Sequence, residues 1–201
     1  MYDDKQFDVA EEAASKAIDL SGEDNQFLVC RCYRALGVIC RSRGETEKAI
    51  RHFETALKVA SAFDWDYILF WNHYCLAELF SDENRFDEAH AHVEQAKSHA
   101  SGVLYRLGRA MELQARIWYK QNMSREAKSE ALRATDAYEK AGATKEVERC
   151  RALLRDIEEV VSHELDSNGE FLEMTPLRTP INFSFSAQGV RHDPTSSPEP
   201  T

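Results

Sequence analysis

The residues best suited to chemistry in this chain are its histidines and cysteines, and their spacing does not build a site. His90 and His92 lie two positions apart, and on a helix such residues point about 200° away from each other, so both cannot hold one metal ion. Cys30 and Cys32 have the same spacing and fail the same test. His90 and Glu94 have a permissible i, i+4 spacing, but two ligands make a weak site. We therefore expect no metal site and interpret the histidines as solvated or capping side chains.

The sequence also lacks the motifs of nucleotide binding and nucleophilic catalysis. No GxxxxGK[ST] or GxGxxG stretch is present that could cradle phosphates with backbone amides. No HExxH helix, paired CxxC or GxSxG elbow occurs, and each serine has a simple interpretation as a cap or surface residue. We expect the protein not to be an enzyme and to need no cofactor.

Charge and composition narrow the class of partner and the compartment. The chain has 201 residues, 43% of them hydrophobic, and a formal net charge of −10. Nucleic acids and anionic membranes bind basic surfaces, so neither is an expected partner. The amino-terminal stretch is acidic and does not resemble a signal peptide. The five cysteines, an odd number within apolar helical patterns, are expected to be buried reduced thiols, which fits a cytoplasmic protein.

The elements that position these residues follow from an internal repeat. Ala10, Ala49, Ala89 and Ala127 begin similar stretches at intervals of 39, 40 and 38 residues, with small or aromatic residues four and seven positions on. A period of this size in a chain with helical patterning predicts stacked helical pairs. No proline precedes Pro176, so long helices can run uninterrupted. The predicted fold is all-α, a superhelical stack of antiparallel helical hairpins.

The pattern predicts eight helices joined by short turns. Their expected ranges are 5–20, 25–43, 46–63, 66–82, 86–101, 103–121, 124–141 and 144–165. Gly37 and Gly108 fall inside helices, where glycine is unfavourable and therefore needs a packing reason. The last helix has an apolar stripe and an opposite charged face, which is typical of a helix that caps a repeat array.

The character of the chain changes near its carboxyl end. Residues 166–201 are rich in proline, serine and threonine, and we expect them to form a disordered tail. Three Ser/Thr-Pro pairs make Thr175, Thr179 and Ser197 candidate phosphorylation sites, although such pairs also arise by chance in a tail of this composition.

The residues around the repeated alanines resemble the tetratricopeptide repeat, in which small side chains at fixed positions let neighbouring helices pack closely. The first copy has Tyr33, Leu36, Gly37, Cys40, Gly44, Ala49, Phe53 and Ala56 at the signature positions. The second has His73, Leu76, Ala77, Phe80, Asn84, Ala89, Val93 and Ala96, and a looser third follows at Met111, Gln114, Ala115, Trp118, Asn122, Ala127, Ala131 and Ala134. The period exceeds the roughly 34 residues of the family signature and resembles the elongated repeats of kinesin-light-chain-like proteins and of arrays associated with fungal signalling ATPases.

This resemblance implies a division of the chain and a binding surface. Residues 1–23 match only the second helix of a repeat, and residues 24–165 hold three hairpins and a capping helix. In tetratricopeptide superhelices the first helix of each pair lines the concave groove. Carried onto this chain, the groove residues are Arg31, Arg34, Val38, Arg41, Trp71, Tyr74, Glu78, Ser81, Arg109, Glu112, Arg116, Tyr119 and Lys120. They favour an acidic protein or peptide ligand, and ordinary solvent-facing charge remains the alternative interpretation.

Members of the family that bind chaperone carboxyl termini suggest a sharper comparison. Their two-carboxylate clamp needs basic residues and asparagines at five positions. Arg34 and Arg109 match it, whereas Val38, Cys75 and Leu113 do not. We therefore do not expect recognition of chaperone carboxyl termini.

Together these observations favour a non-catalytic scaffold or adaptor that binds a peptide or helix in the groove. The alternative is a sensor or oligomerisation array detached from a larger fungal signalling NTPase. Because the helix over 5–20 has a neighbour on one side only, we also expect either self-association through this half repeat or a fragment of a longer array.

Overall fold

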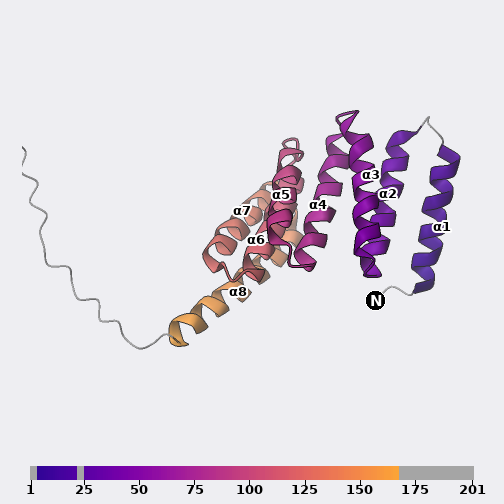
Figure 1. Ribbon diagram of the computed structural model, residues 1–201. Helices are drawn as coiled ribbons and strands as arrows, with labels where there is room; N and C mark the ends of the chain where they lie inside the picture. Colours follow the sequence, from indigo (N-terminus) through magenta and orange to yellow (C-terminus); the bar gives the residue numbers. More distant parts are fainter. Residues whose placement is uncertain (1–3, 22–24, 168–201) are drawn as a thin grey trace, which may run out of the picture. The chain divides into compact units, whose positions relative to one another are not determined.

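A computed structural model describes residues 4–21 and 25–167, and this part of the chain consists of α-helices joined by short turns. Its eight helices are α1 (Asp4–Ser21), α2 (Gln26–Ser42), α3 (Thr46–Ser61), α4 (Asp66–Asp82), α5 (Phe86–Ser98), α6 (Leu104–Lys120), α7 (Ser124–Lys140) and α8 (Thr144–Ser167). Figure 1 shows them side by side, with the chain direction alternating from one helix to the next. Each helix packs mainly against the helices before and after it. This is the stack of antiparallel hairpins that the period of the sequence predicts.

The hairpins α2–α3, α4–α5 and α6–α7 close with the same turn. In each, a backbone amide donates to the carbonyl five residues earlier: Glu45 to Cys40 (2.9 Å), Arg85 to Phe80 (2.8 Å) and Met123 to Trp118 (2.9 Å). The residue before each donor has a positive φ, and it is a glycine or an asparagine: Gly44, Asn84 and Asn122. These residue types adopt the left-handed conformation most readily, so the repeat in sequence becomes a repeat in turn geometry.

The repeated alanines form the contact surfaces of the second helices. Ala49, Ala89 and Ala127 are all completely buried, as are the residues seven positions after each. Small side chains at these positions let the two helices of a pair approach closely. The sequence therefore specifies the stack by placing small side chains at the helix contacts.

The two glycines inside helices have the packing reason that the sequence requires. A Cβ atom on Gly37 would lie 2.5 Å from the ring of Phe53, and one on Gly108 would lie 2.9 Å from the ring of Tyr138. Both rings are completely buried. Each glycine thus makes room for an aromatic ring from the second helix of its own pair.

The two ends of the stack differ. At α8 the apolar stripe is covered, since Cys150 and Ile157 are fully buried against α6 and α7, and the opposite face carries exposed charged residues as predicted. At α1 only Ala14 of the repeated positions is buried, against Cys32 and Leu36 of α2, and Ala10 is exposed.

The predicted fold class is confirmed, and the eight predicted helices begin and end within three residues of the observed ones. All five cysteines are buried and free. The first two residues of the predicted tail, 166–167, belong to α8, and the rest of it, with Thr175, Thr179 and Ser197, lies outside the described residues. Within the described ranges, no helix is long and apolar enough to cross a membrane.

Candidate functional site

The predicted groove residues lie on the face formed by the first helices of successive pairs, which we call the first-helix face. α4 lies at its centre, with α2 on one side and α6 on the other. Most predicted residues from these three helices contact one another, and they divide into two clusters along the helix axes. The division was not predicted.

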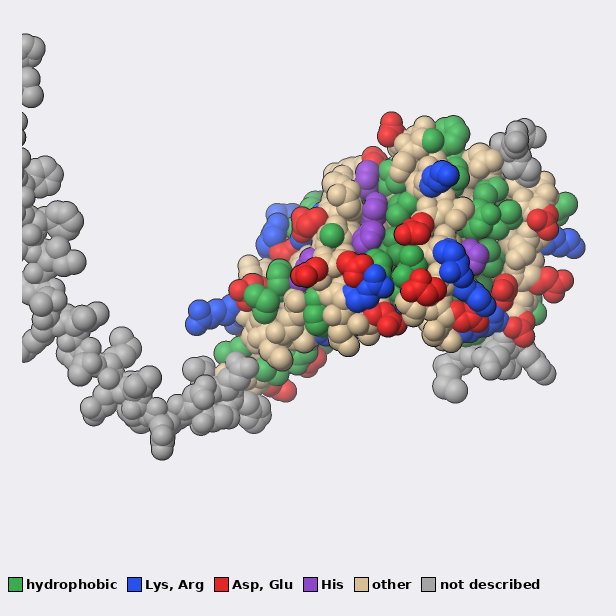
Figure 2. All heavy atoms as spheres, viewed as in Figure 1, with side chains coloured by type: hydrophobic (Ala, Val, Ile, Leu, Met, Phe, Trp, Pro, Cys, Tyr) green, Lys and Arg blue, Asp and Glu red, His purple; other side chains and the backbone are tan. Residues whose placement is uncertain are grey.

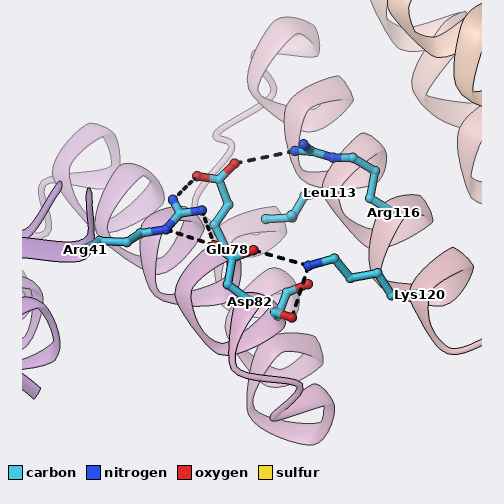
Figure 3. A pocket seen from close by; sticks show the side chains of 7 residues that line it. Arg41, Glu78, Asp82, Leu113, Arg116 and Lys120 are labelled. Atoms are coloured by element: carbon cyan, nitrogen blue, oxygen red, sulfur yellow. Dashed lines mark hydrogen bonds and ion pairs between the residues drawn. The ribbon is translucent and has the colours of Figure 1, made fainter. Parts of the chain in front are cut away.

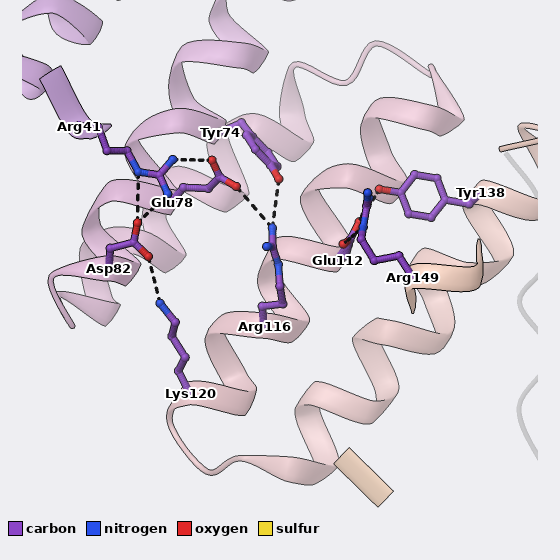
Figure 4. A network of polar contacts seen from close by, with 9 residues as sticks. All are labelled: Arg41, Tyr74, Glu78, Asp82, Glu112, Arg116, Lys120, Tyr138 and Arg149. Atoms are coloured by element: carbon purple, nitrogen blue, oxygen red, sulfur yellow. Dashed lines mark hydrogen bonds and ion pairs between the residues drawn. The ribbon is translucent and has the colours of Figure 1, made fainter. Parts of the chain in front are cut away.

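The first group, the ion-pair cluster, contains Arg41, Glu78, Asp82, Arg116 and Lys120 (Figures 3 and 4). Arg41 of α2 donates to Glu78 at 2.7 Å and to Asp82 at 2.6 Å. From the α6 side, Arg116 approaches Glu78 at 3.5 Å and Lys120 approaches Asp82 at 3.2 Å. The two carboxylates of α4 therefore hold cations from both neighbouring helices.

These contacts pair the charges of the cluster, although Nε of Arg116 is shielded from water and has no described hydrogen-bond partner. Burial opposes ionisation of Asp82, but hydrogen bonds and charge from Arg41 and Lys120 lower the pKa of its carboxyl group. Burial would also lower the pKa of Arg41, and its hydrogen bonds to Asp82 and Glu78 raise it instead. The cavity between these side chains measures about 60 Å³, far less than a site for a small molecule needs. The ion-pair cluster therefore joins three helices, and its cavity does not suit a small molecule.

The second group, the arginine–aromatic cluster, contains Arg34, Trp71 and Arg109. The guanidinium carbon of Arg34, on α2, lies 6.0 Å from the centre of the Trp71 ring, and that of Arg109, on α6, lies 5.9 Å from it. Arg109 also lies 4.9 Å from the ring of Tyr74. No described carboxylate forms an ion pair with either arginine, and both guanidinium groups lie near aromatic rings.

Exposed aromatic side chains continue from this cluster toward the start of α4. Tyr67 lies 6.4 Å from Trp71 and is 43% exposed. Phe27 of α2 stacks on Tyr67 at 6.4 Å and is 38% exposed. Arg31, one turn after Phe27, is exposed and has no ion-pair partner in the described part of the chain. The part of the first-helix face near the start of α4 is thus aromatic and basic.

Several predicted groove residues are buried within the stack, and Tyr74 and Ser81 are only 2% and 3% exposed. Glu112 is only 2% exposed and binds both Arg149 (2.6 Å for each of two bonds) and the Tyr138 hydroxyl (2.8 Å). These bonds lower the pKa of Glu112 although its burial acts in the opposite direction. Tyr119 packs into the apolar cluster between α6, α7 and α8.

Arg149 and Asp82, two ion-pair partners that the sequence analysis did not predict, could have been found from their positions in the sequence. Arg149 lies on α8, about one period after Arg109, so extending the register to the capping helix would have included it. Asp82 follows the predicted Ser81 directly. Of the three positions that depart from the chaperone clamp, Cys75 and Leu113 are 6% and 3% exposed and belong to the apolar core, whereas Val38 is 38% exposed.

The histidines form a separate feature. Figure 2 shows histidine side chains gathered in a column on the face drawn. The rings of His73 and His92 are 5.2 Å apart, and that of His99 stacks on His73 at 5.9 Å. Burial, followed by the charges of His92 and His99, lowers the pKa of His73 to about 4. Across residues 4–21 and 25–167, no group of three or more potential ligands could hold a metal ion.

Comparison with known proteins agrees with this architecture. Residues 1–62, which include α1 and the first hairpin, match the family model described as Tetratricopeptide repeat. No curated protein matches the sequence. Among solved structures, BtubC (BKLC) from P. vanneervenii is similar, with a TM-score of 0.59 and 16% identity over 94% of this chain and 82% of that one. At this level of identity the likeness concerns the fold. The described part of the chain therefore has a tetratricopeptide-like helical repeat fold.

Proposed function

We propose that this protein is a non-catalytic scaffold that binds a peptide or helix of another protein on the first-helix face. Tetratricopeptide-like repeats generally serve protein interaction, and an extended surface built from successive repeats suits a long ligand. The buried free cysteines fit a reducing compartment such as the cytoplasm.

The observation that carries the proposal is the contact of Trp71 with Arg34 and Arg109, two arginines that form no ion pair with a described residue. Three helices from three successive hairpins contribute one side chain each to this point. Tryptophan, tyrosine and arginine are the residue types that most often dominate the energy of protein interfaces. A face that served stability alone would be expected to pair these arginines as it pairs Arg41.

Panning a phage library of random sixteen-residue peptides against the full chain tests this function. Bound peptides are then located by hydroxyl-radical footprinting of the aromatic side chains. We expect Trp71 and Tyr67 to become protected. Protection restricted to the outer surfaces of α3, α5 and α7, or no enrichment of any peptide, would contradict the proposal.

A second candidate function is oligomerisation through α1. Ala10 is exposed although its three counterparts in the other repeats are fully buried, and Val9 and Leu20 are 67% and 78% exposed. Such an apolar face suits packing against a second copy of the chain. Sedimentation at increasing concentration should show association that Val9→Glu with Leu20→Glu abolishes. A monomer at all concentrations would exclude this function.

A further inference from the structure

The side chains around Trp71 leave hydrogen-bond donors unused. The Nε atoms of Arg34 and Arg109 are shielded from water and have no described hydrogen-bond partner, and the same holds for Nε1 of Trp71. Buried donors without acceptors are uncommon and cost free energy. A ligand that supplies acceptor oxygens at this point would remove that cost, and anionic oxygens form the stronger bonds with guanidinium groups.

The ion-pair cluster shows how the same face accommodates such a ligand group. Arg41 lies seven residues after Arg34, two turns further along the same side of α2. There it holds carboxylates of Glu78 and Asp82 at 2.7 and 2.6 Å. At the level of Arg34, α4 presents Trp71 in place of a carboxylate. In the arginine–aromatic cluster the two guanidinium groups form no ion pair with a described residue, although the charge of nearby Glu112 acts on Arg109.

We infer that the ligand of this face is an acidic segment whose carboxylates bind Arg34 and Arg109 on either side of Trp71. This inference rests on the proposed function and specifies the chemistry of its ligand. Each guanidinium lies about 6 Å from the same ring centre, so the two lie at most about 12 Å apart. An extended chain advances about 3.3 Å per residue, so the two carboxylates lie no more than about four residues apart.

The surroundings indicate which residues flank the carboxylates. Tyr67 and Phe27 offer exposed aromatic rings next to the cluster, so apolar ligand side chains would be buried there. Arg31 adds a further positive charge on α2. Against a net charge of −10 for the whole chain, this basic patch would select acidic segments and repel basic ones.

A peptide array tests the inference with the full chain. The probes are twelve-residue peptides of serine and leucine with two glutamates at separations from one to seven residues, each with a matched version containing glutamines. We expect binding for glutamates two to four residues apart and at least a tenfold loss with glutamines. Arg34→Gln and Arg109→Gln should each weaken the best peptide roughly tenfold in fluorescence anisotropy, as loss of a charge-assisted bond implies.

Two control variants test whether binding depends on the position of the arginine rather than on the loss of one positive charge. Arg51→Gln removes an exposed arginine from α3, and Arg41→Gln removes one from the ion-pair cluster. Both should retain wild-type affinity, and circular dichroism of all variants verifies equal helicity. Equal losses in the controls, no preference for glutamate, or no binding of any glutamate pair would overturn the inference. If panned peptides protect Trp71 without containing acidic residues, the acidic ligand is wrong and the proposed function stands.

Discussion

Arg34 and Arg41 lie two turns apart on α2 and face the same neighbouring helix, yet they meet different side chains there. Arg41 meets two carboxylates that also bind cations of α6, so this part of the first-helix face joins three hairpins (Figure 4). Arg34 meets an indole ring, with Arg109 on the other side. One residue type thus forms ion pairs in one cluster and contacts an aromatic ring in the other, and the residues of α4 determine which.

The first test concerns Glu112, a buried carboxylate whose partners are Arg149 and Tyr138. Glu112→Ala removes the partner of Arg149 and Tyr138, and breaking a buried pair should lower the free energy of unfolding by about 3 kcal/mol. Urea denaturation followed by circular dichroism measures it. Glu139→Ala is the control, because Glu139 and its partner Arg151 are 51% and 58% exposed, and less than about 0.5 kcal/mol is expected. Similar losses in both variants would contradict the structural role of Glu112.

Lowering the pH should affect the α4–α5 hairpin but not the arginines of either cluster. Because the pKa of His73 is lowered to about 4, the folded chain keeps this ring neutral where an unfolded chain, with a pKa near 6.5, takes up a proton. The stabilising contribution is therefore full above about pH 6.5 and is lost as the pH falls toward 4.

Allowing for solvent screening of a partly exposed ring, we expect the loss from His73 to reach about 1–2 kcal/mol. Thermal unfolding of the wild type and His73→Gln between pH 7 and 4.5 measures it, and the variant should have the shallower pH dependence. Peptide affinity at the arginine–aromatic cluster should not change between pH 7 and 6. Identical pH profiles for the two proteins would show that His73 is not the titrating group.

Glu78→Gln should make the ion-pair cluster resemble the arginine–aromatic cluster. It removes a carboxylate from Arg41 and Arg116, and because these side chains are partly exposed we expect a stability loss of only about 1 kcal/mol. The freed guanidinium groups should bind acidic peptides several-fold more tightly than in the wild type. Fluorescence anisotropy with the array peptides measures this, and unchanged or weaker binding would mean that the pairing of Arg41 does not exclude ligands.

The smallest effect is expected at the edge of the ion-pair cluster. Lys120 and Asp82 are 43% and 50% exposed, so Lys120→Ala should cost less than about 0.5 kcal/mol. It should also leave peptide binding unchanged, because Lys120 lies more than two turns from Arg109 on α6. A cost above about 1 kcal/mol in urea denaturation would mean that even the exposed pairs hold the stack together.

The fold can be predicted well from the sequence because small residues and turn residues recur at fixed intervals in each repeat. The alanines at fixed intervals, the glycines and asparagines before each second helix and the absence of proline before Pro176 all follow from backbone geometry. Gly37 and Gly108 could be interpreted in advance for the same reason, since only close packing explains a glycine inside a helix.

The site could be predicted only as a set of positions. The family register places Arg34, Arg41 and Arg109 on one face, but it does not show which arginines have partners. Pairing depends on contacts between helices about 40 residues apart, such as Arg41 with Glu78 and Arg149 with Glu112. On α4, Trp71 lies two turns before Glu78. This difference in residue type separates a cluster whose arginines contact a ring from one whose arginines form ion pairs. Composition and spacing within a single helix carry no information about that.

The most direct test of the two-cluster account is a nitrogen–proton correlation spectrum of the arginine Nε groups, recorded with and without the best glutamate-pair peptide. In the free chain, the Nε–H of Arg41 should show the shift and slow exchange of a group bonded to Asp82. On titration, the signals of Arg34 and Arg109 should move together, and that of Arg41 should stay in place. Movement of Arg41 with Arg34 and Arg109 unchanged would contradict the account.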